Sequence, residues 1–156
     1  MANSPLRVLV VDDDPAIRRL LRTALSAYGH AVFEEQTGRG ALQAATIRKP
    51  DAVVLDLSLP DIDGVEVTRM LREWTRLPII ILSVCDRESA KIAALDAGAD
   101  DYLTKPFSMG ELLARLRVAL RHVSYYVQNS DVFSMGDLTV DFTRRIVTVR
   151  DQEVSL

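Results

Sequence analysis

The stretch DAVVLDLSLPD, residues 51–61, decides the fold because it joins a buried strand to a carboxylate. Its apolar run, Ala52–Leu55, predicts a strand covered on both faces, and the run ends on Asp56. A charge beside a hydrophobic core is unfavourable unless neighbouring groups stabilise it, so Asp56 requires an explanation. Two other segments are similarly β-branched and apolar, namely Arg7–Val11 and Ile79–Leu82. Two weaker strand candidates are His30–Glu34 and Asp101–Thr104.

Helical patterns separate these predicted strands. In the first, apolar residues from Ile17 to Tyr28 recur at helical spacing, after Asp14 at the N-cap and Pro15 at the first helical position. Four further helices are expected at Gly38–Lys49, Gly64–Thr75, Arg87–Ala97 and Met109–His122. Five strands alternating with five helices predict an α/β fold with a parallel sheet. Right-handed crossovers place the functional crevice of such a fold at the carboxyl ends of its strands.

The pattern changes after His122. Residues 123–131, VSYYVQNSD, lack a helical period and are predicted to form a linker. Beyond them, Asp137–Asp141, Arg145–Val149 and Glu153–Leu156 alternate apolar and polar residues, which is typical of antiparallel strands. Three short strands cannot bury a core of their own, so the chain is expected to end where a second domain begins. The predicted parts are a first domain at 1–122, a linker at 123–131 and a partial β-domain at 132–156.

The composition of the 156-residue chain is that of an ordinary globular protein, with 48% hydrophobic and 26% charged residues. A formal charge of −3 gives no basic field that would indicate nucleic-acid binding. The single cysteine, Cys85, excludes an internal disulfide and favours a reducing compartment. No apolar run approaches the roughly 18 residues that span a bilayer. We therefore expect a cytoplasmic protein with no membrane partner.

Acidic residues follow two of the predicted strands. Asp12 and Asp13 come after the first strand, and Asp56 comes after the third. In a parallel sheet these carboxylates converge on one crevice, where they repel each other and raise each other's pKa. A divalent cation removes that conflict, and a site with few carboxylates and several retained waters suits Mg²⁺. Lys105, after the fifth strand, supplies a positive charge on the opposite side.

These residue types fit phosphoryl transfer. A carboxylate held ionised beside Mg²⁺ and a lysine can attack a phosphoryl group. The metal and Lys105 would stabilise charge on the transferring oxygens, and Ser83, after the fourth strand, could donate a hydrogen bond to one of them. Taken singly, residues here also have structural explanations, with Asp14 as a helix cap and Asp61 and Asp63 as turn residues. The functional interpretation depends on the joint position of the acids, Ser83 and Lys105 at one edge.

Four segments occur in order along the chain: VLVVDDDP (8–15), VVLDLSLPDIDG (53–64), IIILS (79–83) and GADDYLTKPF (98–107). Together they resemble the receiver domain of two-component response regulators, over about residues 6–122. The resemblance implies a flavodoxin-like, doubly wound sheet of order 2-1-3-4-5, and it makes Asp56 the phosphoacceptor for a sensor histidine kinase. Such a protein is not an ordinary enzyme, although it assists its own Mg²⁺-dependent phosphorylation and dephosphorylation.

The resemblance also implies roles around Asp56. The Mg²⁺ ligands would be Asp13, Asp56 and the backbone carbonyl of Ser58, with Asp12 acting through water. The residues that respond to phosphorylation would be Ser83, Tyr102 and Lys105. Ser83 would move toward the phosphoryl group and Tyr102 would turn inward into the space released. The peptide bond between Lys105 and Pro106 is expected to be cis.

The segment DAGADDYLTKPF, residues 96–107, resembles the OmpR/PhoB class of response regulators. Receivers of that class form homodimers through the fourth helix, the fifth strand and the fifth helix. The positions that match the charged ladder of the class are Lys91, Asp96, Asp100, Asp101, Glu111, Arg115 and Arg117. A solvated charged face is the alternative, because an exposed ion pair contributes only about 0–1 kcal/mol.

The second domain in this class is a winged helix that begins with an antiparallel sheet, which Asp137–Leu156 resembles. The recognition helix and wing would follow Leu156, so DNA binding is expected only of the full-length protein. Dimerisation would place two such domains on adjacent half-sites. Within the class, two segments taken together are similar to regulators of potassium-uptake genes: IRRLLRTALSAYGHAVFE, residues 17–34, and KIAALDAGADDYLTKPFSMGELLARLRVALR, residues 91–121.

Two other functions deserve comparison with this interpretation. A phosphatase of the haloacid dehalogenase type needs a second acid two residues after its nucleophile, and Ser58 occupies that place. A receiver-like interaction module that works without phosphate is disfavoured by the complete set of site residues. One residue departs from the usual receiver pattern and keeps this alternative open: Val84 follows Ser83, where receivers usually have alanine or glycine. We hypothesise that Val84 narrows access to the phosphoryl group and slows its reactions with small donors and water.

Overall fold

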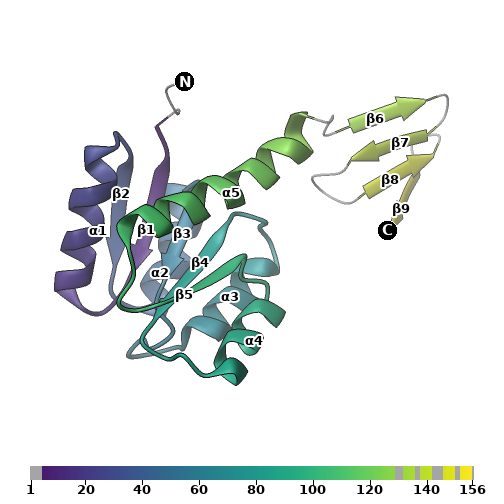
Figure 1. The fold of residues 1–156 in the computed structure, drawn as a ribbon. Coiled ribbons are helices and arrows are strands. Elements are labelled where there is room, and N and C mark those ends of the chain that lie inside the picture. The colour runs from purple at the N-terminus through teal and green to yellow at the C-terminus, as the bar shows by residue number, and fades with distance from the viewer. Residues whose placement is uncertain (1–4, 129–131, 136–137, 142–145, 150–151, 156) are drawn as a thin grey trace. The chain divides into compact units, whose positions relative to one another are not determined.

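The computed structural model describes residues 5–128, 132–135, 138–141, 146–149 and 152–155, with side chains described as far as Arg121. The strands of its first part are β1 (Arg7–Val11), β2 (Ala31–Glu35), β3 (Ala52–Leu55), β4 (Ile79–Ser83) and β5 (Asp101–Thr104). The helices are α1 (Pro15–Ala27), α2 (Gly38–Arg48), α3 (Gly64–Arg72), α4 (Glu88–Asp96) and α5 (Met109–Gln128). The five strands pair in parallel in the order β2-β1-β3-β4-β5, which confirms the predicted fold and strand order (Figure 1).

Alternation along each strand divides the core into two layers. Val8 and Val10 of β1 pack on the side of α1 and α5, whereas Leu9 and Val11 pack on the side of α2, α3 and α4 (Figure 1). The central strands β3 and β4 are buried along their whole length. Because helices cover both faces, these strands are apolar at every position before Ser83, the last residue of β4, which is why the sequence shows apolar runs in place of alternation.

Side-chain caps begin four of the five helices, and Ser108 supplies the one for α5, where its hydroxyl accepts from the Glu111 N–H at 3.1 Å. The Asp14 carboxylate accepts a hydrogen bond from the backbone N–H of Ala16, as expected of a cap at the start of α1. Thr37 and Asp63 cap α2 and α3 in the same manner. Helix α3 ends at Arg72, before the predicted Thr75, because the N–H groups of Glu73 and Trp74 bond to carbonyls three residues back and tighten the final turn.

Helix α5 runs past its predicted end at His122, so residues 123–128 of the predicted linker are helical, and their role as a linker between two domains stays a prediction. The apolar period fades there, but VSYYVQ contains no glycine or proline that would stop a helix. Valine and tyrosine lower helix propensity by only about 0.5 kcal/mol per residue, so an established helix continues through them. Residues 129–131 of the predicted linker lie outside the described residues. Within the described ranges, neither α5 nor any other helix is long and apolar enough to cross a membrane.

The remaining strands form an antiparallel sheet of order β6-β7-β8-β9. They are β6 (Val132–Met135), β7 (Leu138–Asp141), β8 (Ile146–Val149) and β9 (Gln152–Ser155). The last three agree closely with the predicted strands, whereas β6 was missed because VFSM does not alternate. The chain divides into two compact units after Arg117, and the assignment of the second as part of a winged helix stays a prediction.

Candidate functional site

Three acidic side chains meet at the carboxyl ends of β1 and β3, which are neighbours in the sheet. Asp12 and Asp56 are placed by the strand ladder, since the Asp12 N–H donates to a carbonyl of β2 and the Asp56 N–H donates to the Val11 carbonyl of β1. One carboxylate oxygen each from Asp12, Asp13 and Asp56 lies within 4.8 Å of the other two. Asp12 and Asp56 are buried, while Asp13 is exposed. The predicted convergence of the acids is confirmed.

Lys105 contacts this acidic cluster from the end of β5. Its ammonium nitrogen lies 2.7 Å from Oδ2 of Asp12 and 3.7 Å from Oδ2 of Asp56. The backbone N–H of Lys105 donates to the Ser83 carbonyl, which ties the lysine to the end of β4. The peptide bond before Pro106 is cis, as predicted. Because the lysine side chain is only 13% exposed, its charge acts on the acids with little screening by water.

The pKa of the Asp56 carboxyl is raised above its ordinary value. Burial is the main cause because it penalises the charged form, and the neighbouring Asp12 and Asp13 carboxylates add to the rise. Lys105 and the backbone N–H of Ser58, 3.4 Å from Oδ1 of Asp56, act in the opposite direction. The cluster therefore holds more negative charge than Lys105 balances. An oxygen-only donor set with excess negative charge fits a hard divalent cation such as Mg²⁺.

Ser83 and Tyr102 both contact the backbone of Cys85, in the loop between β4 and α4. The buried Ser83 hydroxyl accepts a hydrogen bond from the Cys85 N–H at 3.1 Å. The Tyr102 hydroxyl donates to the Cys85 carbonyl at 2.5 Å. Cys85 is partly buried, and a hydrogen bond from Arg87 lowers the pKa of its thiol. The joint role of the Cys85 backbone is not apparent from the sequence, because backbone contacts leave no residue-type signal.

A family model described as the response regulator receiver domain matches residues 8–117. The chain belongs to the response regulator family. It is 55% identical over 150 residues to the KDP operon transcriptional regulatory protein KdpE of Escherichia coli (strain K12), covering 96% of this chain and 66% of that protein. It is 47% identical over 155 residues to the response regulator MprA of Mycolicibacterium vanbaalenii, covering 97% of this chain and 67% of MprA.

A solved receiver has the same fold as the first part of the chain. The BeF3-activated N-terminal receiver domain of Klebsiella pneumoniae RstA matches with 36% identity and a TM-score of 0.71, over 74% of this chain and 98% of that one. The chain spans 66% of the length of the Escherichia coli KdpE. The similarity to KdpE and MprA confirms the resemblance to OmpR-class regulators.

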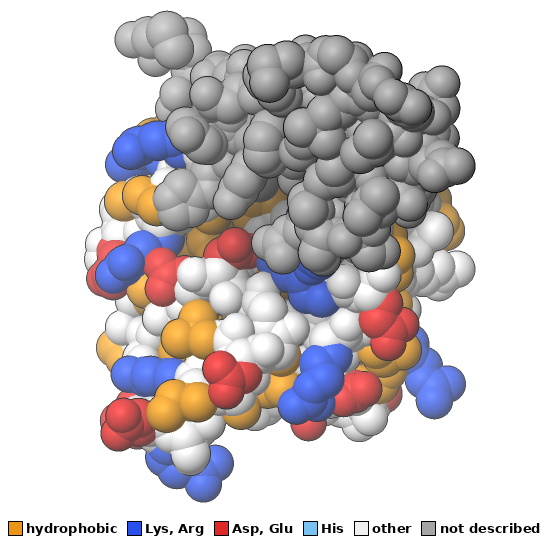
Figure 2. All heavy atoms as spheres, turned by 90° about the vertical axis from the view of Figure 1, so that its right-hand side faces the viewer, with side chains coloured by type: hydrophobic (Ala, Val, Ile, Leu, Met, Phe, Trp, Pro, Cys, Tyr) orange, Lys and Arg blue, Asp and Glu red, His pale blue; other side chains and the backbone are white. Residues whose placement is uncertain are grey.

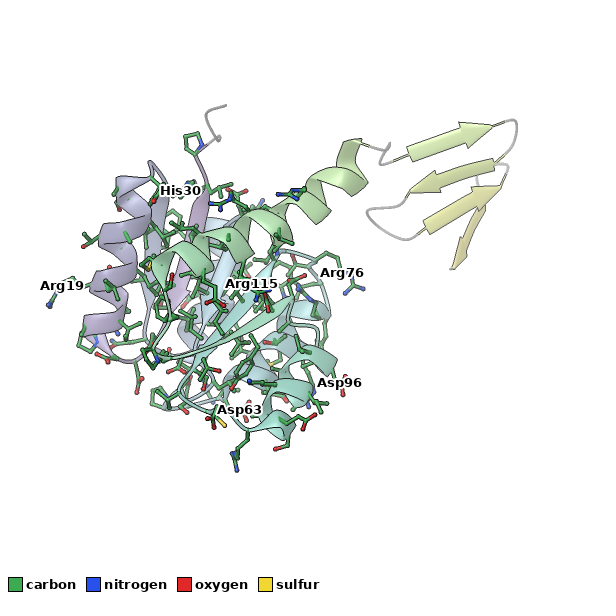
Figure 3. All side chains as sticks on the ribbon, in the orientation of Figure 1. Arg19, His30, Asp63, Arg76, Asp96 and Arg115 are labelled. Atoms are coloured by element: carbon green, nitrogen blue, oxygen red, sulfur yellow. The ribbon has the colours of Figure 1, made fainter. Side chains whose placement is uncertain are left out.

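The residues of the predicted dimer face lie on or beside three elements of the receiver. They are Lys91 and Asp96 on α4, Asp100 and Asp101 at the start of β5, and Glu111, Arg115 and Arg117 on α5. Nε of Arg115 lies 3.3 Å from Oδ2 of Asp101, and Nη2 of Arg115 lies 3.7 Å from Oε1 of Glu111. Figure 3 shows Arg115 on α5 and Asp96 on the outside of α4. Because these ion pairs lie within one chain, the dimer face stays a prediction.

Asp100 has partners inside the receiver. Its Oδ2 accepts hydrogen bonds from Nη2 of Arg72 at 2.9 Å and from the N–H of Ile79 at 2.8 Å. Arg72 also donates to the carbonyls of Gly98 and Leu77. Asp100 therefore joins the end of α3 to the start of β4 and is less available to a second chain than an acid without such partners.

Asp61 was expected to be a turn residue, and the structure shows a longer-range role as well. Its carboxylate accepts hydrogen bonds from the N–H groups of Gly38 at 2.8 Å and Arg39 at 2.9 Å, so it caps α2 from the loop that follows Asp56. The Arg39 bond is the main reason that the pKa of Asp61 falls to about 2. A contact between residues this far apart in the chain has no signal in the sequence.

Asp61→Asn is expected to remove a pH-dependent part of the stability. Because folding lowers the pKa of Asp61, its contribution is present above the ordinary value of about 3.9. That contribution is lost as the pH falls toward about 2. The stability difference between the parent and Asp61→Asn in urea unfolding should thus shrink on acidification. Asp96→Asn, an exposed acid on α4, is the control, and a difference for Asp61→Asn that persists unchanged in acid would contradict this assignment.

Proposed function

We propose that this chain is the receiver part of a cytoplasmic two-component response regulator that accepts a phosphoryl group on Asp56 from a sensor histidine kinase. The observation that carries the proposal is the position of the Asp56 carboxylate beside Asp12, Asp13 and Lys105, in a chain of the receiver family. The kinase is inferred from the family, since receivers take their phosphoryl group from such partners. The chain acts as a phosphoacceptor that assists the transfer.

The Asp56 carboxylate supplies the nucleophile. One of its oxygens forms a bond to phosphorus while the bond from phosphorus to the histidine nitrogen of the donor breaks, and the electron pair leaves with the imidazole. Lys105 would stabilise negative charge on the phosphoryl oxygens, and the Ser83 hydroxyl would donate a hydrogen bond to one of them. The proximity of Lys105 to Asp56 supports this role for the lysine.

Mg²⁺ is the cofactor that fits the acidic cluster. Its ligands would be Asp13, Asp56 and the backbone carbonyl of Ser58, with Asp12 acting through water. When bound, the ion supplies positive charge that reduces repulsion between the Asp56 carboxylate and the phosphoryl donor. The raised pKa of Asp56, caused first by burial and then by its acidic neighbours, supports a need for that charge.

The output is a shift between two conformations of the loop after β4. In the structure the Ser83 hydroxyl oxygen accepts a hydrogen bond from the Cys85 N–H, and the Tyr102 hydroxyl donates one to the Cys85 carbonyl. A phosphoryl group on Asp56 would accept a hydrogen bond from Ser83 and so change these contacts. The ammonium of Lys91 lies 6.0 Å from the centre of the Tyr102 ring, so movement of that ring reaches the proposed dimer face. An energy change of a few kcal/mol is enough to shift such an equilibrium.

The proposed consequence is a homodimer through α4, β5 and α5. On the side of the receiver that carries α3 and α4 in Figure 1, Figure 2 shows acidic and basic side chains interspersed with hydrophobic ones. Such a surface suits pairing through opposite charges around apolar contacts, and Ile92 and Leu95 of α4 are large exposed apolar residues.

The full-length protein is proposed to regulate transcription. The KdpE relative is a transcriptional regulatory protein by name, and the chain spans 66% of its length. The antiparallel sheet β6–β9 would begin a winged-helix domain, and DNA would be bound only by the full-length protein. The chain is 55% identical to KdpE and 47% identical to MprA. The higher identity favours a role like that of KdpE, which we propose to be the control of potassium-uptake genes.

The direct test is labelling with radioactive acetyl phosphate. We expect the chain to take up label only with Mg²⁺ present, and we expect the label to be lost in acid and on treatment with hydroxylamine, as acyl phosphates are. EDTA should prevent labelling. Absence of label with Mg²⁺, under conditions where a known receiver is labelled, would favour an interaction module that works without phosphate.

Val84→Ala is expected to increase the rate of this labelling severalfold. The Val84 side chain is 73% exposed, and it follows Ser83 directly, so its bulk lies on the solvent side of the site. The smaller side chain would admit acetyl phosphate and water more easily, so spontaneous dephosphorylation should also accelerate. Equal rates for the parent and Val84→Ala would count against this gating role.

A further inference from the structure

We propose that Arg18 is a positioning residue for the metal ligand Asp13, acting through the peptide that joins Asp12 to Asp13. This inference rests on the proposed function, because it concerns the same cation site. Arg18 lies on α1, and its Nη1 donates a hydrogen bond to the backbone carbonyl of Asp12 at 2.6 Å. That carbonyl belongs to the planar peptide unit leading into Asp13, so fixing it fixes where the Asp13 side chain begins.

The positions of Asp12 and Asp13 depend to different extents on the hydrogen bond from Arg18. The Asp12 carboxylate is buried and already held, because Oδ1 accepts from the Asp14 N–H at 2.9 Å and Oδ2 accepts from Lys105 at 2.7 Å. Asp13 is exposed, and its direction follows mainly from its backbone. Loss of the Arg18 contact should therefore displace Asp13 more than Asp12.

Arg18 is itself fixed by β2. Its Nε lies 3.4 Å from Oε1 of Glu34, and the arginine side chain is only 17% exposed. The carboxylate of Glu34 offsets the charge of Arg18, so the guanidinium adds little repulsion against a cation at the acidic cluster. A shielded donor with a compensated charge is suited to orienting a metal ligand, as groups behind the direct ligands do in metal sites.

A purely structural role for Arg18, which would only join α1 to β2, is the competing explanation. Arg22 provides a matched control, because it lies one turn further along α1, pairs with the same Glu34 and donates to the Val32 carbonyl. Arg19 controls for charge, since Figure 3 shows its side chain pointing away from α1. Replacing either residue removes a positive charge from the same helix and leaves the bond to Asp12 in place.

The experiment is calorimetric titration of the full chain with Mg²⁺, together with thermal unfolding of each variant. Arg18→Ala is expected to weaken Mg²⁺ binding about tenfold, the lower end of the range for groups that orient metal ligands. Arg18→Lys keeps a cationic donor and should recover part of the affinity. Arg22→Ala and Arg19→Ala should bind Mg²⁺ like the parent, even where the melting temperature falls. At saturating Mg²⁺, labelling of Arg18→Ala by acetyl phosphate should return toward the parental rate.

Parental Mg²⁺ affinity in Arg18→Ala would overturn this inference and leave the proposed function intact. Tighter binding would overturn it as well, because it would show that the charge of Arg18 outweighs its orienting role. If Arg18→Ala does not fold, Arg18→Met replaces it, since methionine keeps the apolar part of the side chain without the donor, and the same tenfold loss is expected. Failure of the parent to bind Mg²⁺ would count against the proposed function itself.

Discussion

Asp56→Asn is expected to abolish labelling by acetyl phosphate and to raise the melting temperature at neutral pH. The first effect follows because an amide cannot replace the attacking carboxylate. The second follows from the raised pKa of Asp56, which burial and then the Asp12 carboxylate produce. A raised pKa means that the protonated form favours the folded state, and this favourable contribution is lost as the pH rises through the raised value. The amide in Asp56→Asn stays neutral at every pH, so this variant avoids that loss. Asp56→Asn should therefore be more stable than the parent at neutral pH and equally stable in acid.

Thermal unfolding with and without Mg²⁺ checks this expectation. Mg²⁺ should raise the melting temperature of the parent more than that of Asp56→Asn, because a ligand that binds the folded state adds more stability the more tightly it binds. Glu73→Gln serves as the control, since it removes an equal charge from an exposed residue at the end of α3 and should be labelled normally. Label retained by Asp56→Asn would place the acceptor elsewhere. A lower melting temperature for the metal-free variant would refute the electrostatic explanation.

Much of the fold could be predicted because its signals are local. The apolar runs at β1, β3 and β4 are strong because both faces of the sheet are covered, and the cap at Asp14 marks where the first helix begins. The strand order and the shared crevice then follow from the handedness of parallel crossovers. The carboxylates of Asp12, Asp13 and Asp56 could be placed together on these grounds alone.

The parts that could not be predicted depend on contacts to backbone atoms or on distant residues. The Cys85 N–H donates a hydrogen bond to the Ser83 hydroxyl oxygen, and the Cys85 carbonyl accepts one from Tyr102. The Asp12 carbonyl accepts a hydrogen bond from Arg18. A carbonyl or N–H is present at nearly every position, so no residue type marks these partners. The extension of α5 to Gln128 was missed for another reason, since helix continuation depends on cooperativity more than on local periodicity.

Gly64→Ala is expected to lower the free energy of unfolding by about 1–3 kcal/mol, as overpacking against fixed atoms does. A Cβ at Gly64 would lie 2.4 Å from the Asp56 carbonyl oxygen and 2.9 Å from Cα of Leu57, and both are backbone atoms that cannot rotate away. The Gly64 N–H donates to the Leu57 carbonyl at 2.8 Å, so the start of α3 is held close to the segment that carries Asp56. Relief of the clash would therefore displace this segment.

This displacement should also slow phosphorylation, because a shift of about 1 Å in a reacting group can cost about a hundredfold in rate. Gly110→Ala is the matched control, since its Cβ would meet only the Ser108 hydroxyl oxygen at 3.5 Å among the described atoms. That variant should be neutral or more stable by about 0.5–1 kcal/mol, as alanine favours a helix. Urea unfolding and acetyl phosphate labelling of both variants separate the two effects. A Gly64→Ala variant as stable as the parent would disprove the close approach of α3 to Asp56. A destabilised Gly64→Ala variant that is labelled at the parental rate would contradict the expected slowing, because the Asp56 carboxylate would then keep its position when its backbone moves.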